Sequence, residues 1–138
     1  HNKVSYTLQT KRTTTNILGF RKIWFDRIDG LLPEALAWIP QSTVALVINK
    51  GMQNCVRNYS NVVPLLQVHD SFLFQVRRNS FYDTLPKVRE AMAVVLPYQR
   101  PLIIPVTLKT SLVSWGEMLP TSWEGQIMDG NGGGKWII

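Results

Sequence analysis

The sequence is poor in the residues on which several common active sites depend. Its 138 residues include one cysteine, Cys55, and two histidines, His1 and His69. A single cysteine excludes an internal disulfide and a cysteine-rich zinc site, and it suits a reducing, intracellular compartment. Two histidines are too few for a metal hydrolase built on paired histidines. Ser71 lies too close to His69 for the relay of a serine hydrolase, and no G-x-S-x-G motif occurs.

Long apolar runs are also missing. No run approaches the roughly 20 residues of a membrane span, and no signal peptide is visible, so we expect no membrane partner. The glycines at 130–134 follow no strand and open no apolar helix, which argues against a phosphate loop. The chain begins at His1 without an initiator methionine, as expected for a processed product or a piece of a longer protein.

What the chain has is apolar and basic. A hydrophobic content of 45% with 17% charged residues predicts a folded segment with one modest core. The net charge is +6 and the pI about 9.8, which fits a polyanionic partner such as a nucleic acid. The basic residues crowd the first stretch, at Lys3, Lys11, Arg12, Arg21, Lys22 and Arg27.

The first half of the chain predicts a hairpin followed by two helical segments. The run 13–25 favours a β-hairpin with its turn near Asn16 to Gly19. Arg21 and Lys22 leave that turn as a basic pair, either a phosphate surface or a solvated edge that discourages aggregation. Pro40 should kink or interrupt the helix that begins near Pro33. A second helix, 41–57, has an apolar face of Val44, Val47, Ile48, Met52 and Cys55.

The central stretch, 64–76, predicts a second hairpin with strands at 65–68 and 72–76. His69, Asp70 and Ser71 then lie at or next to its turn. A carboxylate at the tip of a mostly buried hairpin needs a cationic partner, and magnesium takes such oxygen ligands. The alternative is that Asp70 is only a turn former. Arg77 and Arg78 end the hairpin as a second basic pair.

The last third predicts one more helix and one more strand. Ser80 is a plausible N-cap for a helix that contains Phe81, Leu85, Val88, Met92 and Val95, with Pro86 bending it or delaying its start. The run 102–108 predicts a strand in which Pro105 marks an edge or a bulge. Regular structure should close near 114–118. The Gly-rich tail, 121–138, is expected to be flexible or docked on a partner, with Trp123 and Trp136 as isolated anchors.

The acids limit what this chain can do alone. Of its nine Asp and Glu residues, only Asp70 is flanked by strands on both sides. Two-metal phosphoryl chemistry needs at least two carboxylates that hold ions about 4 Å apart. Either Asp70 is not catalytic, or its partner acid lies on a segment absent from this chain.

The run Leu66-Gln67-Val68-His69-Asp70-Ser71 resembles the third conserved motif of family A DNA polymerases, which is a hairpin of the palm domain. Two more blocks follow the order of that family. The run 15–21 is similar to its strand-turn-strand, and 37–45 resembles the helix-break-helix of phage-type members. The run 114–117 looks like their C-terminal ending. The resemblance covers residues 1–120, the C-terminal palm portion.

The resemblance implies an α+β fold: an antiparallel palm-type sheet with a metal-site β-hairpin packed against helices, preceded by a β-hairpin. It also implies that Asp70 is a catalytic metal ligand for two Mg²⁺ ions and that His69 supports the primer 3′ end. Gln41 would contact primer-template DNA in the minor groove. The four basic residues Arg21, Lys22, Arg77 and Arg78 would contact phosphates. The cytoplasm, such as that of a phage-infected bacterium, would be the location.

The chain departs from the family pattern in three ways. Ser71 stands where many members have Glu, and Ala37 and Pro33 stand where the family has Asn and Arg. The first palm motif and the fingers helix are missing. We therefore expect a DNA polymerase part that is inactive alone and needs a polypeptide carrying those motifs, with primer-template DNA and deoxynucleoside triphosphates as substrates. The alternatives are a non-catalytic nucleic-acid-binding module derived from a palm, and a structural domain.

Overall fold

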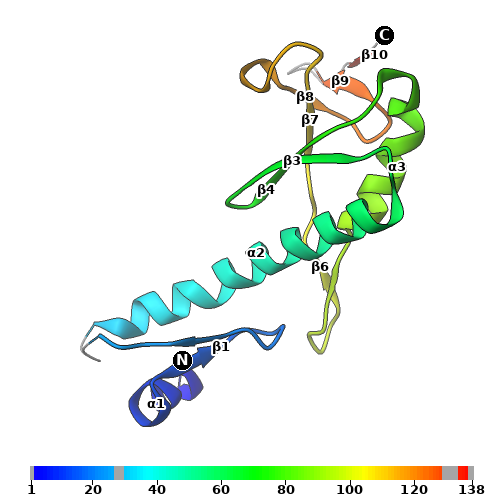
Figure 1. The fold of residues 1–138 in the computed structure, drawn as a ribbon. Coiled ribbons are helices and arrows are strands. Elements are labelled where there is room, and N and C mark those ends of the chain that lie inside the picture. Colours follow the sequence, from blue (N-terminus) through cyan, green and yellow to red (C-terminus); the bar gives the residue numbers. More distant parts are fainter. Residues whose placement is uncertain (1, 27–29, 129–133, 137–138) are drawn as a thin grey trace.

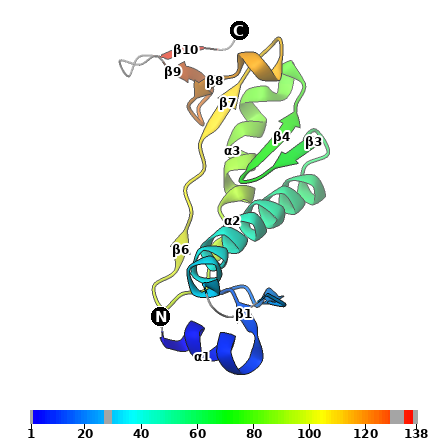
Figure 2. The ribbon, with the colours of Figure 1, turned by 90° about the vertical axis from the view of Figure 1, so that its left-hand side faces the viewer.

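A long helix runs through the middle of the molecule and carries the smaller elements on its sides. The computed structural model describes residues 2–26, 30–128 and 134–136. The fold is α+β, as expected, with helices and small antiparallel ladders. Figure 1 shows an N-terminal helix and hairpin beside the first half of the long helix, and a second hairpin beside its other half. Figure 2, turned by 90°, also shows the two hairpins apart from each other.

The helices and strands follow one another in this order. The N-terminal half holds α1 (Asn2–Lys11), β1 (Thr13–Thr15), β2 (Arg21–Ile23) and α2 (Leu31–Asn58). The middle holds β3 (Val63–Val68), β4 (Ser71–Gln75), the 3₁₀ turn η1 (Arg78–Ser80), α3 (Phe81–Met92), β5 (Val95–Leu96) and β6 (Leu102–Ile103). The last part holds β7 (Leu108–Thr110), the 3₁₀ turn η2 (Trp115–Glu117), β8 (Leu119–Thr121), β9 (Gln126–Met128) and β10 (Gly134–Trp136).

The predicted N-terminal hairpin is confirmed. Strand β1 pairs antiparallel with β2, with Thr14 opposite Lys22, and Asn16 and Gly19 lie in the turn. Helix α1 was not expected, because its sequence has almost no apolar periodicity. Its Leu8 is buried with Trp24 and with residues of α2, so tertiary packing rather than local pattern accounts for this helix.

Helix α2 is continuous, so the expected interruption at Pro40 is wrong. Pro40 lacks the N–H that would bond to the carbonyl four residues earlier. Burial holds the helix on both sides of this gap, since Ala35 and Val47 are both almost fully buried. The hydroxyls of Ser42 and Thr43 also donate to the carbonyl of Ile39, one residue before the proline. The cost of one lost bond is offset by packing along the helix.

The continuous α2 changes the expectation about membrane spans. With 28 residues, it is long and apolar enough to cross a membrane by length and composition alone. This is a weak sign, because the core helix of a soluble protein has the same properties.

The predicted apolar face of α2 is confirmed as a core face: Val47, Ile48 and Cys55 are buried, while Val44 and Met52 are half-buried. The fold is consistent with a soluble protein.

The main core lies where α3 crosses the second half of α2. Val88, Ala91 and Met92 of α3 pack with Ile48 and Cys55 of α2. Gly51 allows this close approach, since a Cβ there would meet the Sδ of Met92 at 2.6 Å and its Cα at 3.2 Å. The helices can therefore touch almost backbone to backbone.

The predicted start of α3 is confirmed, and its predicted end is wrong. The helix follows Ser80 and runs through Pro86, but the Ser80 hydroxyl donates to the carbonyl of Arg77 instead of capping the helix. Val95, expected in the helix, belongs to β5. The helix ends at Met92 and the chain turns into the β5–β6 ladder, where Leu96 is buried.

The C-terminal part is more regular than expected. The predicted strand 102–108 is split into β6 and β7 around Pro105, which cannot donate to a ladder. Strands β7, β8, β9 and β10 then form a four-stranded antiparallel sheet in the order β10-β9-β8-β7, so the expectation that regular structure closes near 118 is wrong. Residues 129–133, which include three glycines of the tail, lie outside the described residues.

Both tail tryptophans contact the chain's own residues. The indole N–H of Trp123 donates to the carbonyl of Val106 at 3.2 Å, and its ring packs against the main core. The ring of Trp136 lies 5.9 Å from that of Tyr82 on α3. The side chains that looked like isolated anchors therefore fix the sheet to α3 and to the segment before β7.

Candidate functional site

The predicted second hairpin is confirmed, and its turn carries the expected residues. Strands β3 and β4 pair antiparallel, with Val68 opposite Ser71, so His69 and Asp70 form a two-residue turn. A bulge between Pro64 and Leu66 shifts the register near the start of β3. The hydroxyl of Ser71 donates to the carbonyl of Val68 at 2.8 Å and closes the turn.

The backbone of His69 is unusual. Its φ is +50°, in the left-handed region that non-glycine residues rarely occupy. Two-residue hairpin turns usually place Gly, Asn or Asp where φ is positive. Holding another residue there costs on the order of 1–3 kcal/mol, and such positions cluster at functional sites. Arg12 has a similar φ of +51°, so the feature particular to this turn is that its left-handed residue, His69, stands next to Asp70.

The hairpin is much less buried than expected, so the desolvation argument for a metal at Asp70 is wrong. Both His69 and Asp70 are exposed. Five of the six residues of β3 are exposed, among them Val63, Leu65 and Leu66. A carboxylate that remains in water needs no cation to compensate for burial. A metal at Asp70 must be argued from the ligands around it.

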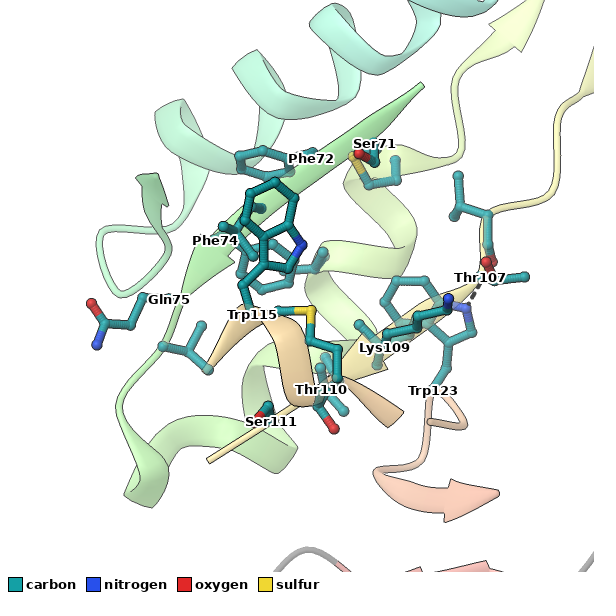
Figure 3. Close-up of a pocket in the computed structure, with 18 of the residues that line it drawn as sticks. Ser71, Phe72, Phe74, Gln75, Thr107, Lys109, Thr110, Ser111, Trp115 and Trp123 are labelled. Carbon is teal, nitrogen blue, oxygen red and sulfur yellow. Dashed lines mark hydrogen bonds between the residues drawn. The ribbon is translucent and has the colours of Figure 1, made fainter. Parts of the chain in front are cut away.

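A groove runs from the turn along β4. It has a volume of about 740 Å³ and is lined by Asp70, by residues of β4 and α3, and by the segment 104–112 with Trp115. Figure 3 draws Phe72, Phe74 and Trp115 among the residues that line this groove. Val44 and Ile48 of α2 also line the groove. Asp70 therefore lines a groove that one face of α2 helps to form.

Gln41 lies on the same side of α2, one turn before Val44, because residues three and four apart share a helix face. It is exposed and lies inside α2, ten residues after Leu31. The expectation that Gln41 stands at the start of a helix after a break is wrong, since α2 is continuous. The structure nevertheless puts Gln41 on the face of α2 that leads toward the His69–Asp70 turn.

The four basic site residues lie away from the turn. Arg77 and Arg78 follow β4, at the end of the hairpin opposite to His69 and Asp70. Arg21 and Lys22 lie in β2, beside the first half of α2 (Figure 1). All except Lys22 are exposed. The structure therefore gathers His69 and Asp70 at one tip and distributes the basic residues over two other places.

Lys22 already has partners within the chain. Its Nζ lies 3.5 Å from a carboxylate oxygen of Glu34 and 3.7 Å from the centre of the Trp24 ring. Both interactions stabilise the ammonium group where it is. Arg21, which has no such partner among the described residues, is the better phosphate contact on this hairpin.

The residues at the turn fit magnesium only in part. The Asp70 carboxylate offers hard oxygen ligands of the kind that magnesium prefers. Within residues 2–26, 30–128 and 134–136, no group of three or more His, Cys, Asp or Glu side chains could hold a metal ion. Asp70 can therefore supply one protein ligand, and a complete two-metal site needs carboxylates from outside the described chain.

The sequence did not single out Lys109 or Trp115 as site residues, although both line the groove. Trp115 was recognised only as part of a C-terminal block. The available signal was weak: an exposed tryptophan in a Ser- and Gly-containing turn, and a lysine in a short strand. Which groove they face depends on the path of the chain from α3 through β7, and this path is a tertiary property.

No protein-family model, no curated protein and no solved structure matches this chain.

Proposed function

We propose that this chain is the C-terminal palm portion of a phage-like family A DNA polymerase, acting in two-metal nucleotidyl transfer with Asp70 as its metal ligand. The observation that carries the proposal is the His69–Asp70 turn, in which an exposed carboxylate follows a residue held at positive φ. Two-residue hairpin turns commonly need a positive φ, and here a histidine rather than a glycine occupies that position. A turn that must present an acid and an imidazole together would keep it.

The roles are those that the resemblance to family A DNA polymerases implies. Asp70 contributes one carboxylate to magnesium, and His69, its neighbour in the turn, supports the primer 3′ end. Bound magnesium would help to activate the 3′-hydroxyl and neutralise charge on the leaving pyrophosphate. Gln41 on α2 would position the primer terminus through the minor groove. The exposed Arg21, Arg77 and Arg78 would contact DNA phosphates, while Lys22 mainly stabilises its own hairpin.

The proposal requires a second polypeptide segment. The described chain brings one acid to the turn, so another carboxylate and the residues that bind the deoxynucleoside triphosphate must come from a segment that carries the first palm motif and the fingers. The exposed apolar side chains of β3 are compatible with such a neighbour, since an isolated two-stranded hairpin is marginally stable. Palm-type architecture and a cytoplasmic location are parts of this same proposal.

The test is primer extension by this chain co-expressed with the polypeptide encoded immediately upstream. Asp70→Ala should abolish extension in the presence of Mg²⁺. Glu90→Ala is the matched control, because Glu90 is an exposed acid on α3, away from the turn. Equal extension by wild type, Asp70→Ala and Glu90→Ala would contradict the assignment of Asp70. Absence of extension in all three would remove the polymerase proposal for this pair of polypeptides.

A second candidate function is a non-catalytic nucleic-acid-binding module. It is favoured by one observation, the net charge of +6, which suits a polyanionic partner without any catalytic site. This candidate predicts salt-sensitive binding to primer-template DNA that Asp70→Ala leaves unchanged or strengthens. Binding with no extension would favour it over the polymerase.

A further inference from the structure

The groove beside β4 has an aromatic wall that the polymerase proposal does not use. Phe72 and Phe74 lie half-buried on β4, and their rings stack with centroids 5.2 Å apart and planes at 29°. Trp115, on η2, lines the same groove, and 56% of its surface is exposed (Figure 3). Among the described residues, Trp115 makes no ring-to-ring contact. An exposed indole therefore borders the groove with its π-faces free of aromatic partners.

The turn that carries Trp115 is held in place by hydrogen bonds. The Ser111 hydroxyl oxygen accepts bonds from the backbone N–H of Val113 at 3.0 Å and of Ser114 at 3.2 Å. The Ser114 hydroxyl donates to a carboxylate oxygen of Glu117 at 3.3 Å. These bonds lie on both sides of Trp115, so the indole is presented by a structured turn. A preorganised side chain loses less entropy when it binds a ligand.

Two positive charges also line the groove. Arg78 lies on η1 and Lys109 on β7, and both are exposed. Neither forms an ion pair within the part of the chain that the structure describes. The single acid in the lining is Asp70. A ligand that combines a flat aromatic group with a negative charge complements this lining.

The volume fits a ligand of that size. Sites for small molecules typically measure about 300–1,000 Å³, and the groove of about 740 Å³ lies within this range. Proteins that bind single-stranded nucleic acid combine aromatic platforms, on which bases stack, with cations that follow the phosphates. The faces of bases inside a duplex are covered by their neighbours, so this lining suits an unpaired base better than a paired one.

We propose that the groove formed by β4, β7 and the 111–117 turn binds an unpaired nucleotide of a single-stranded nucleic acid, with its base stacked on Trp115 beside Phe72 and Phe74 and its phosphates near Lys109 and Arg78. The groove contains neither Gln41 nor Arg21, and it shares Arg78 and Asp70 with the polymerase proposal. It needs neither a metal nor the missing polymerase motifs, and it stands whether or not the chain polymerises.

The experiment is fluorescence-anisotropy titration of the chain with a labelled oligodeoxythymidine of about 12 nucleotides, in low salt with EDTA. Trp115→Ala should weaken binding about 10-fold, since stacking contributes on the order of 1–3 kcal/mol per base. Trp115→Phe keeps a ring and should recover most of the affinity. Lys109→Ala should weaken binding and lower the slope of log affinity against log salt by about 0.7.

The matched control is Phe25→Ala, which removes an aromatic side chain that is 87% exposed but lies outside the groove. It should bind as tightly as wild type, and circular dichroism should show every variant folded. Equal binding by Trp115→Ala and wild type overturns the proposal, as does equal affinity for a fully paired duplex of the same length. Self-association that Trp115→Ala removes, without any binding of the oligonucleotide, would instead identify the groove as a protein interface.

Discussion

The two hairpins of this protein differ in how fully the rest of the chain buries and hydrogen-bonds their side chains. The β1–β2 hairpin has short strands but buried polar anchors. The indole N–H of Trp24 donates to Thr14 at 3.0 Å. The Asn16 side chain accepts bonds from two backbone N–H groups of the turn and donates to Ser42 on α2, so it joins hairpin and helix. Asn16, Thr14 and Trp24 are each at most 5% exposed.

The β3–β4 hairpin has longer strands and much weaker attachment. Among the described residues, the only hydrogen bond donated by one of its side chains runs from Ser71 to Val68 and closes its own turn. Its outer strand leaves apolar side chains in water, and its turn holds His69 at a costly φ. In the first hairpin, the polar side chains are buried and hydrogen-bonded within the chain. The second hairpin leaves apolar side chains exposed and one residue at a costly φ, which we attribute to a ligand or a partner. Four predictions test this contrast.

The largest expected effect is on activity at the second hairpin. Asp70→Ala should lower primer extension by the assembled polymerase at least about 100-fold, the scale on which single groups that stabilise transition-state charge act. The free energy of unfolding should change by less than about 0.5 kcal/mol, because Asp70 is exposed. Primer extension and urea denaturation measure the two quantities. A large loss of stability would mean that the turn is structural, contrary to the contrast drawn here.

The reverse is expected at the first hairpin. Trp24→Ala should lower the free energy of unfolding by about 4 kcal/mol, because it removes a large buried side chain and leaves the Thr14 hydroxyl unpaired. Phe25→Ala is the matched control, since its neighbouring ring is 87% exposed, and should change stability by less than about 0.5 kcal/mol. Similar losses for both variants in urea denaturation would show that burial at this hairpin does not decide its stability.

A pH-dependent effect is expected in the core beneath the second hairpin. Cys55 packs with Val62 and with the half-buried Phe72 and Phe74, and burial raises the pKa of its thiol to about 11 from an ordinary value of 9.0. The folded state therefore holds this proton more tightly than the unfolded state. This contribution is complete below about pH 9 and is lost as the pH rises through about 11, and the loss of stability reaches about 2 kcal/mol at that pH.

The measurement is urea denaturation from pH 8 to about pH 11, beside Cys55→Ala as the control. The variant starts from lower stability because it loses buried volume, but it should lose less stability than wild type across this pH range. Parallel pH profiles for the two proteins would mean that the thiol is open to solvent in the native state. That outcome would make the second hairpin and its core looser than the structure indicates.

The smallest effect is expected at His69. His69→Gly relieves the left-handed backbone, so the free energy of unfolding should stay unchanged or rise by up to about 1 kcal/mol. His69→Val places a β-branched side chain at the same φ and should lower it by about 1 kcal/mol. Thermal unfolding ranks the variants. If the free energy of unfolding falls equally in both variants, the imidazole itself stabilises the turn. The argument from backbone strain to function then fails.

The sequence predicted elements whose cause is local. Alternating and β-branched residues around a tight turn predicted both hairpins, and helical spacing from Val44 to Cys55 predicted the core face of α2. The turn position of His69 and Asp70 followed from the same pattern. Local pattern failed where packing overrode it. Pro40 lies inside a continuous helix, and α1 forms without apolar periodicity because Leu8 is buried against Trp24.

By itself, then, the sequence determined the basic charge and the placement of the acid–imidazole pair at or next to a tight turn, since these depend on neighbours along the chain, and the resemblance implied the α+β class. Only the tertiary structure decided that the second hairpin is exposed, that Lys22 is paired with Glu34, and that the chain after Met118 returns as a sheet. It also brought Trp115 and Lys109 to one groove with Phe72. The reason is physical: burial, pairing and cavities depend on contacts between segments far apart in sequence, which no local periodicity encodes.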